Sequence, residues 1–270
     1  MRICVCSAAT ANIEWQYKYT NFLKCKYCEK HGYNFIFEII KDEPKLAYHY
    51  RKDMLLRLMN DYDIVVWTDA DVWFNDFDEK IENLVPDDAN IGMILSRDHF
   101  EFSNAKVWHQ CYINSGVIIV RSGDIARNLI RLWKEPPAAG SRWMEKNTRL
   151  NDQPFLSIRV LFDSYFSDKV CIKNPIDMNW FIRMGKWEDK FILHAAGIEK
   201  SVTKREDFYK ALIETYKKNI GAMPKSLIDD VKSAIKGDQK KSYWEKVFGE
   251  AEFIPDGYDY KPTLKPASKY

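Results

Sequence analysis

Apolar runs of strand length alternate with helical segments along the first half of the chain. The runs are separated by turn residues, and they span residues 3–6, 34–40, 64–67, 91–95 and 116–120. Between them, apolar side chains recur at steps of three and four residues, as at Trp15, Tyr19 and Leu23. That spacing is typical of amphipathic helices that cross over from one strand to the next. The pattern therefore predicts an α/β fold with a mixed, mainly parallel sheet flanked by helices.

The hydrophobic pattern changes after about residue 200. Before that point, a further amphipathic helix is predicted over residues 125–133, and a run with two prolines and a glycine ends it. Beyond it, apolar positions at helical spacing lie in segments with charged outer faces, such as 208–216 and 227–235. We therefore expect one domain over residues 1–205 and a C-terminal helical extension with an irregular tail over residues 206–270.

Composition narrows the functional classes. The 270 residues are 46% hydrophobic, which is enough to bury one substantial core. Basic and acidic residues number 41 and 39 and form no long block of one sign, so the charge does not indicate a nucleic-acid partner. No apolar stretch has the length of a membrane span, and no signal peptide precedes the first strand. The sequence thus predicts a soluble, cytoplasmic protein without a transmembrane segment.

Six cysteines stand at positions 4, 6, 25, 28, 111 and 171. A core of this size does not need disulfides, so we expect reduced thiols. Cys25 and Cys28 have the spacing of a zinc-ligand pair, but the sequence has no second pair at zinc spacing. These two thiols also lie in a segment of helical character, which favours a structural role.

Two carboxylates, Asp69 and Asp71, follow the apolar run that ends at Trp67. The carboxyl ends of strands are where open α/β sheets bind ligands. If the chain leaves the extended conformation at Ala70, both carboxylates turn toward one point. Two carboxylates would repel a nucleotide diphosphate unless a divalent cation, Mn²⁺ or Mg²⁺, bridged them to it. The pattern therefore indicates a metal-dependent site for a nucleotide diphosphate.

Two other interpretations fit the same carboxylates. One is a solvated turn after a strand, although the apolar strand before the pair and Trp73 and Phe74 behind it favour a built site. The other is a phosphohydrolase of the haloacid dehalogenase type, which also places Asp-x-Asp after a strand and uses the first Asp as nucleophile. Such enzymes carry Thr or Val where Trp73 stands, and their motif lies nearer the N-terminus.

Three further motifs follow along the chain. They are Asn114-Ser115-Gly116, Asp152-Gln153, and a His-x-x-Gly-x-x-Lys pattern formed by His194, Gly197 and Lys200. Each has a structural alternative. The first suits a tight turn that feeds a buried strand, the second suits a helix N-cap, and the histidine suits a core position at the end of a strand.

With these motifs in this order, residues 1–200 resemble the GT-A retaining glycosyltransferases. The resemblance is strongest to the galactosyl- and mannosyltransferase family of yeast and plants and more distant to the glycogenin-like transferases. It implies a GT-A catalytic domain that transfers a hexose or pentose from a nucleotide-diphosphate sugar to a glycan or other acceptor. UDP-sugars are the favoured donors and GDP-sugars the second choice. A non-catalytic carbohydrate-binding protein of the same fold is the alternative from another functional class.

The resemblance also implies roles for single residues. His194 would be the third ligand of the cation beside Asp69 and Asp71, and Lys200 would contact the diphosphate. Asp152 and Gln153 would act as the catalytic pair, holding the donor sugar and facing its anomeric carbon. Other donor contacts are implied for Asp69, Asn114, Ser115, Gly116 and Gly197.

Further donor contacts are expected at two places around the first helices. Small residues follow the first strand and let a nucleoside approach the backbone, so Thr10 and Asn12 are candidates. A basic residue on the helix before the carboxylate pair, Lys52 or its neighbour Arg51, is a candidate to point at the donor, and a solvated helix face is the alternative for each of the two.

Overall fold

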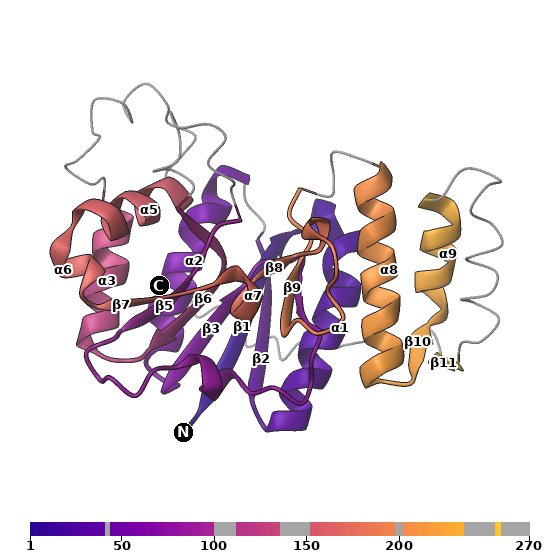
Figure 1. Cartoon of the computed structure of the whole chain (residues 1–270), viewed down its shortest axis with the longest axis horizontal. Coiled ribbons are helices and arrows are strands. Elements are labelled where there is room, and N and C mark those ends of the chain that lie inside the picture. Colours follow the sequence, from indigo (N-terminus) through magenta and orange to yellow (C-terminus); the bar gives the residue numbers. More distant parts are fainter. Residues whose placement is uncertain (41–43, 100–111, 136–151, 198–201, 235–251, 255–270) are drawn as a thin grey trace.

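The computed structural model describes residues 1–40, 44–99, 112–135, 152–197, 202–234 and 252–254. Its strands form a central layer with helices on both sides (Figure 1). The elements before residue 100 are β1 (Ile3–Thr10), the 3₁₀ turn η1 (Ala11–Ile13), α1 (Glu14–His31), β2 (Asn34–Ile40), α2 (Pro44–Leu58), β3 (Ile64–Thr68), β4 (Val72–Phe74), η2 (Ile81–Leu84) and β5 (Met93–Arg97). Those from residue 112 to 197 are β6 (Ile113–Arg121), α3 (Asp124–Lys134), α5 (Gln153–Phe162), α6 (Ser164–Ser167), β7 (Val170–Lys173), α7 (Pro175–Met178), β8 (Trp180–Phe181), η4 (Ile182–Met184) and β9 (Ile192–His194). The last are α8 (Val202–Asn219), β10 (Ala222–Pro224), α9 (Lys225–Ala234) and β11 (Glu252–Ile254).

The described part of the central sheet has the strand order β2-β1-β3-β6-β5-β7. β1 pairs in parallel with β2 and β3, and β5 pairs in parallel with β7. Only β6 among these strands runs antiparallel to its neighbours. The predicted mixed, mainly parallel sheet is therefore confirmed, and the five predicted strands correspond to β1, β2, β3, β5 and β6.

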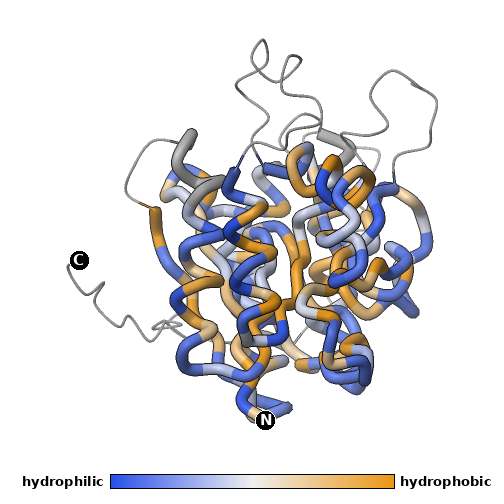
Figure 2. Tube along the Cα trace, turned by 90° about the vertical axis from the view of Figure 1, so that its left-hand side faces the viewer, coloured by the Kyte–Doolittle hydropathy of each residue, from blue (hydrophilic) through white to orange (hydrophobic). Residues whose placement is uncertain are grey.

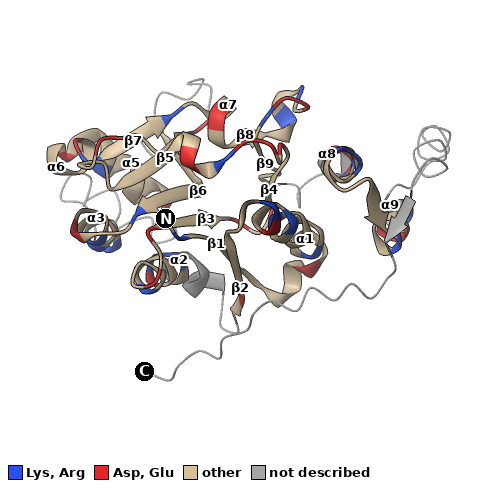
Figure 3. Cartoon of the chain, turned by 90° about the horizontal axis from the view of Figure 1, so that it is seen from below, with Lys and Arg blue, Asp and Glu red and all other residues tan. Residues whose placement is uncertain are grey.

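Strand alternation divides the core between the two faces of the sheet. On one face, Val5 and Val66 pack in a cluster that includes side chains of α1, β4, β9, α8 and α9. On the other, Cys6 and Trp67 pack in a cluster with α2, α3 and α5. The helices show hydrophilic and hydrophobic stretches in alternation along the trace (Figure 2), and both charge signs are interspersed over them (Figure 3). This two-sided burial explains why the strands are apolar at consecutive positions.

A second, smaller sheet has the order β4-β9-β8 and lies beside the carboxyl edge of the central one (Figure 1). Its strand β4 begins directly after the turn that contains Asp69 and Asp71. The antiparallel register pairs Val72 with His194. The small sheet therefore carries a distant part of the chain to the end of β3.

The C-terminal helices share the core of the sheet. Thr215 on α8 accepts a hydrogen bond from the indole Nε1 of Trp73 at 3.1 Å, and the Tyr216 hydroxyl donates to the carbonyl of Tyr19 on α1 at 3.1 Å. The division of the chain at residue 205 stays a prediction, and the predicted irregular tail over 255–270 lies outside the described residues.

The thiols and helices fit two further expectations. Cys4, Cys6, Cys25, Cys28 and Cys171 are free, and Cys111 lies outside the described residues. Cys25 and Cys28 are both on α1, as expected for a structural pair. Within the described ranges, every helix is too short or too polar to cross a lipid bilayer.

Candidate active site

The carboxylate pair lies in a tight turn between β3 and β4. The chain leaves the extended conformation after Thr68, and the amide of Val72 donates to the carbonyl of Asp69 at 3.1 Å. The amide of Asp69 donates to the carbonyl of Gly116 on the neighbouring strand at 2.8 Å. The predicted departure from extended structure at Ala70 is thus confirmed.

Two side chains of helix α1 donate hydrogen bonds to backbone carbonyls of this turn. The Thr20 hydroxyl donates to the carbonyl of Ala70 at 2.6 Å, and the Lys24 ammonium donates to the carbonyl of Asp69 at 2.9 Å. Both side chains are fully buried. Because Thr20 and Lys24 are four residues apart, they lie on the same face of the helix. Burial lowers the pKa of Lys24 to about 7, although the carboxylates of Asp71 and Asp69 act in the opposite direction.

His194 lies beside the two carboxylates in a group of three side chains with the donor atoms to hold a metal ion. One ligand atom from each of Asp69, Asp71 and His194 lies within 4.8 Å of the others. The imidazole Nε2 of His194 is 3.4 Å from Oδ1 of Asp71. Carboxylate oxygens together with an imidazole nitrogen suit Mn²⁺ or Mg²⁺. The donor set therefore fits the cation that the sequence predicts.

The electrostatics of this group also favour a cation. Burial raises the pKa of Asp71, but the charge of His194 and its hydrogen bond lower it, and the net pKa is below the usual 3.8. Burial lowers the pKa of His194, but the charges of Asp71, Asp69 and Asp98 raise it above the usual 6.5. The carboxylates thus draw a positive charge to the point where they meet His194.

Arg51 connects this group to a second buried carboxylate. Its guanidinium pairs with Asp152, donates to the carbonyl of Ser115 and lies 3.5 Å from Oδ1 of Asp69. The indole Nε1 of Trp67 donates to the same Oδ1 at 2.7 Å. Lys52, the donor contact expected from the sequence, is fully buried, with its Nζ 3.7 Å from Oδ1 of Asp152. Of the two basic neighbours, Arg51 is the one that bridges both carboxylates.

Asp152 stands at the N-cap position of α5, but its side chain makes no capping hydrogen bond. Its carboxylate is only 7% exposed and turns toward Arg51 instead. Oδ1 of Asp152 accepts no hydrogen bond within the part of the chain that the structure describes. A cap alone therefore does not account for this residue, and the N-cap alternative is wrong for its side chain.

The Asn114-Ser115-Gly116 motif was expected to be a turn before a strand, and that expectation is wrong. The three residues lie inside β6, opposite a shift in the register between Leu95 and Ser96 of β5. Such a bulge adds a local kink to a strand without ending it. Within this stretch, Oδ1 of Asn114 accepts a hydrogen bond from the amide of Gly116 at 2.9 Å.

Gln153 is held by groups that the sequence analysis did not identify. Its Nε2 donates to Oδ2 of Asp98 at 2.9 Å, and its Oε1 accepts from the amide of Ser115 at 3.3 Å. Asp98 follows β5, a strand that runs parallel to β3. Its position at the carboxyl end of a predicted strand could therefore have identified it as a candidate site residue from the sequence. Asn179, which is fully buried and contacts His194, follows a four-residue helix and had no such signal.

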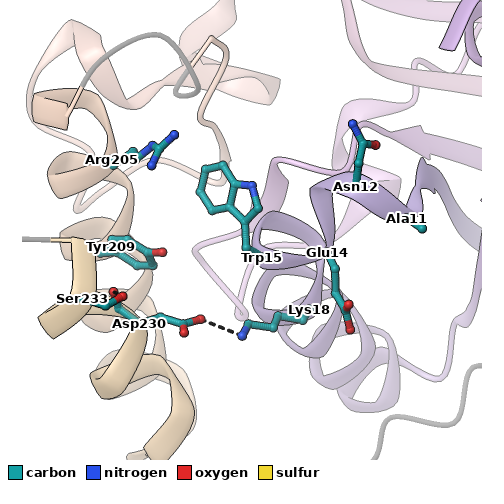
Figure 4. A pocket seen from close by; sticks show the side chains of 9 residues that line it. All are labelled: Ala11, Asn12, Glu14, Trp15, Lys18, Arg205, Tyr209, Asp230 and Ser233. Carbon is teal, nitrogen blue, oxygen red and sulfur yellow. Dashed lines mark hydrogen bonds and ion pairs between the residues drawn. The ribbon is translucent and has the colours of Figure 1, made fainter.

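Thr10 and Asn12 lie at the carboxyl end of β1, where the Thr10 hydroxyl donates to Oδ1 of Asn12 at 2.5 Å. Asn12 opens into a groove of about 560 Å³. Figure 4 shows Trp15 projecting into this groove from α1, with side chains of α8 and α9 on its opposite side. Asp230 on α9 pairs with Lys18 on α1 at 2.6 Å. The groove has the volume of a small-molecule site.

Two of the predicted donor contacts follow β9. Gly197 is exposed and has φ of 71°, a left-handed conformation that favours glycine. Lys200 lies outside the described residues.

The sequence matches no protein-family model, and no curated protein matches it. Solved structures do resemble the chain. A crystal structure of a glycosyltransferase involved in glycosylation of the major capsid of PBCV-1 has a TM-score of 0.57 and 18% identity, covering 78% of this chain and 98% of its own. The galactosyltransferase LgtC in complex with donor and acceptor sugar analogs has a TM-score of 0.49 and 16% identity, covering 77% and 95%. The central sheet and its flanking helices thus have the GT-A glycosyltransferase fold.

Proposed function

We propose that this protein is a metal-dependent glycosyltransferase that moves a sugar from a nucleotide-diphosphate sugar to a glycan or other acceptor. The observation that carries the proposal is the convergence of Asp69, Asp71 and His194 within 4.8 Å, at the carboxyl edge of a GT-A sheet. Ligands of α/β proteins bind at this edge. UDP-sugars are the favoured donors and GDP-sugars the second choice, with retention of configuration, as in the galactosyl- and mannosyltransferase family.

In this proposal Asp69, Asp71 and His194 hold Mn²⁺ or Mg²⁺. When bound, the cation neutralises the diphosphate and the negative charge that grows on it as the glycosidic bond breaks. Asp69 is less buried than Asp71, with side chains 35% and 19% exposed, so it is the carboxylate more open to the donor. Lys200 is proposed as a further contact of the diphosphate.

The donor sugar is proposed to lie between the metal-binding residues and the start of α5. Asp152 supports this because its Oδ1 has hydrogen-bonding capacity left beside Arg51. Gln153 lies next to it, with Oε1 turned toward Ser115. A carboxylate and an amide oxygen are suited to hold sugar hydroxyls and to face an anomeric carbon that becomes positive. Lys52, Asn114, Gly116 and Gly197 remain proposed contacts around the same place.

The nucleoside of the donor is proposed to bind at the end of β1. Asn12 provides an amide at the rim of the groove, and the half-buried ring of Trp15 adds an aromatic surface beside it. Aromatic faces stack on planar bases and contribute about 1–3 kcal/mol per base in other proteins. Thr10 is proposed to orient Asn12 through their mutual hydrogen bond.

The decisive experiment combines ligand-dependent melting with donor turnover. UDP and Mn²⁺ together should raise the melting temperature more than either ligand alone. At a ligand concentration a hundredfold above Kd, the free energy of unfolding should increase by about 2.7 kcal/mol. A panel of UDP- and GDP-sugars should identify one from which Mn²⁺-dependent release of nucleotide occurs. The variant Asp71→Asn should abolish both effects. Asp78→Asn is the control because its side chain is 90% exposed. If neither nucleotide shifts the melting temperature with any divalent ion, the proposed function is wrong.

A further inference from the structure

His194 can bind a cation through Nε2 only if that nitrogen carries a lone pair. In a neutral imidazole, one ring nitrogen holds the hydrogen and the other is the acceptor. The hydrogen must therefore be on Nδ1, which faces away from Asp71. A chain of buried amides that reaches Nδ1 decides between the two tautomers.

The orientation of these side-chain amides follows from a backbone group that is a hydrogen-bond donor only. The backbone amide of Gly116 can only donate, and it lies 2.9 Å from one side-chain atom of Asn114. That atom must be the carbonyl Oδ1. The opposite end of the Asn114 amide, Nδ2, faces Oδ2 of Asp98 at 3.5 Å, and an ionised carboxylate can only accept. Both ends therefore give the same orientation for Asn114.

Asn179 passes this orientation on to the imidazole. The atom of Asn179 that lies 2.7 Å from Oδ1 of Asn114 must be a donor, so it is Nδ2. Its carbonyl Oδ1 consequently faces Nδ1 of His194 at 3.0 Å. Because a carbonyl oxygen only accepts, Nδ1 has to carry the hydrogen. Nε2, which faces Asp71, is then left with the lone pair.

We propose that Asn179 and Asn114 are positioning residues that hold neutral His194 in the Nδ1–H tautomer and so present the Nε2 lone pair for a divalent cation. The cation is part of the proposed function, and the tautomer can be measured without it. Asn179, Asn114 and His194 are no more than 6% exposed, so water does not compensate for an unmatched pair. The Nε2–H tautomer would set a lone pair on Nδ1 against the Asn179 carbonyl at 3.0 Å, an arrangement that buried groups avoid. Without metal, the Nδ1–H tautomer sets the Nε2 lone pair near Oδ1 of Asp71 at the longer distance of 3.4 Å, so the shorter contact with Asn179 decides the tautomer.

These contacts give Asn114 a second role, beside the donor contact proposed for it above. Its Oδ1 already accepts from Gly116 and Asn179, and its Nδ2 is directed at Asp98. Asn114 therefore acts on the reaction through His194. The same Asp98 oxygen accepts from Gln153, so one carboxylate orients both the metal-binding and the sugar-facing side of the site.

The tautomer is measured by ¹⁵N NMR of the imidazoles in the metal-free protein, in a pH titration continued until the His194 signals stop shifting and the ring is neutral. His194→Gln identifies the signal. We expect the wild type to show Nδ1–H at His194. Asn179→Leu removes the acceptor, and the Nε2–H form should then appear, with Mn²⁺ affinity reduced about 10–100-fold. Asn179→Asp keeps an acceptor opposite Nδ1 and should retain the wild-type tautomer, although stability should fall because its second carboxylate oxygen faces Oδ1 of Asn114 in place of a donor.

Asn75→Leu is the matched control. Asn75 is a buried asparagine that bonds to backbone carbonyls of residues 187 and 190, away from His194. It should lower stability without changing the tautomer or the Mn²⁺ affinity. An Nε2–H signal in the wild type overturns the inference, and so does an Nε2–H signal in Asn179→Asp. The Asn179→Asp variant keeps the inference testable if Asn179→Leu does not fold. If the wild-type protein shows Nδ1–H at His194 but binds no Mn²⁺, the role of Asn179 and Asn114 in setting the tautomer is supported and the proposed metal site is wrong.

Discussion

Gly116 and His194 are in contact across the junction of the two sheets. A β-carbon on residue 116 would lie 2.4 Å from Cε1 and 2.7 Å from Nδ1 of the imidazole. Such distances do not occur between unbonded atoms, so the imidazole occupies the space that any other residue would fill at this position. Among the described residues, the group nearest to the α-carbon of Gly116 on this side is therefore the His194 imidazole.

Gly116→Ala should therefore impair metal binding. The added methyl group has to displace the His194 ring, which breaks its alignment with Asp71 and Asn179. We expect Mn²⁺ affinity to fall at least about tenfold and stability to fall by about 1–3 kcal/mol. Titration of Mn²⁺ followed by electron paramagnetic resonance measures the first effect, and denaturation the second.

Gly92→Ala is the control for that variant. A β-carbon there would meet Cγ2 of Ile125 at 2.7 Å and the amide of Ala126 at 2.9 Å, so overpacking is comparable. Gly92→Ala should lower stability and leave Mn²⁺ affinity unchanged. Normal Mn²⁺ affinity in Gly116→Ala would show that His194 is not a ligand.

The raised pKa of His194 predicts opposite pH dependences with and without metal. Without metal, protonated His194 stabilises the fold fully below about pH 6.5, and this contribution is lost as pH rises through the higher folded pKa. With Mn²⁺, the proton competes for Nε2, so the metal-induced rise in melting temperature should grow with pH across the same interval. Melting curves from about pH 5.5 to 8.5 test both trends when they are compared with those of His194→Ala, because the opposite contribution of Lys24 is common to both proteins. His194→Ala should remove both, and His31→Ala neither.

Lys24 predicts a second pH dependence, at higher pH. Its pKa is about 7 in the fold and 10.5 when unperturbed, so between these values the unfolded chain binds one more proton. Stability of the metal-free protein should therefore rise with pH in this interval, by up to about 1.4 kcal/mol per pH unit from this group. Lys24→Met should remove the slope in urea denaturation. Lys30→Met, at a side chain 46% exposed, should keep it.

Arg51 should be required for both stability and activity. Its removal in Arg51→Met leaves Asp152 without its main cationic partner, and loss of one member of a buried pair costs about 3–5 kcal/mol. Arg51→Lys keeps the charge but loses the planar guanidinium, which reaches Asp69, Ser115 and Asp152 together. Donor turnover should therefore still fall in this variant. These effects are measured by denaturation and by nucleotide release.

Arg57→Lys provides the comparison for Arg51→Lys. Arg57 pairs with Glu38 at 2.6 Å, and its own side chain is 45% exposed. The change at this surface pair should cost less than about 1 kcal/mol and leave turnover intact. Equal effects of the two Arg→Lys substitutions would contradict a bridging role for Arg51.

Much of the fold and part of the site could be predicted from the sequence because their signals are local. The apolar runs at 3–6, 34–40 and 64–67 each carry the pattern of a buried strand, and each is present as β1, β2 or β3. Asp69 and Asp71 directly follow such a run, so their place at a carboxyl strand end needed no knowledge of the rest of the chain. The third proposed ligand, His194, was implied by resemblance to known transferases.

The tertiary structure alone decided which distant groups meet. The β4–β9 register brings His194 to Asp71, and Asn114 in β6 accepts a hydrogen bond from Asn179. The preference for Arg51 over Lys52 as the bridging cation likewise follows from the contacts of the Arg51 side chain with the Ser115 carbonyl in β6 and with Asp152 before α5. None of these relationships has a local signature, because strand pairing and buried hydrogen bonds are selected by the free energy of the whole packed chain. Sequence spacing specifies which residues share a strand or helix face, whereas the partner opposite that face is specified only when the sheets close around a common core.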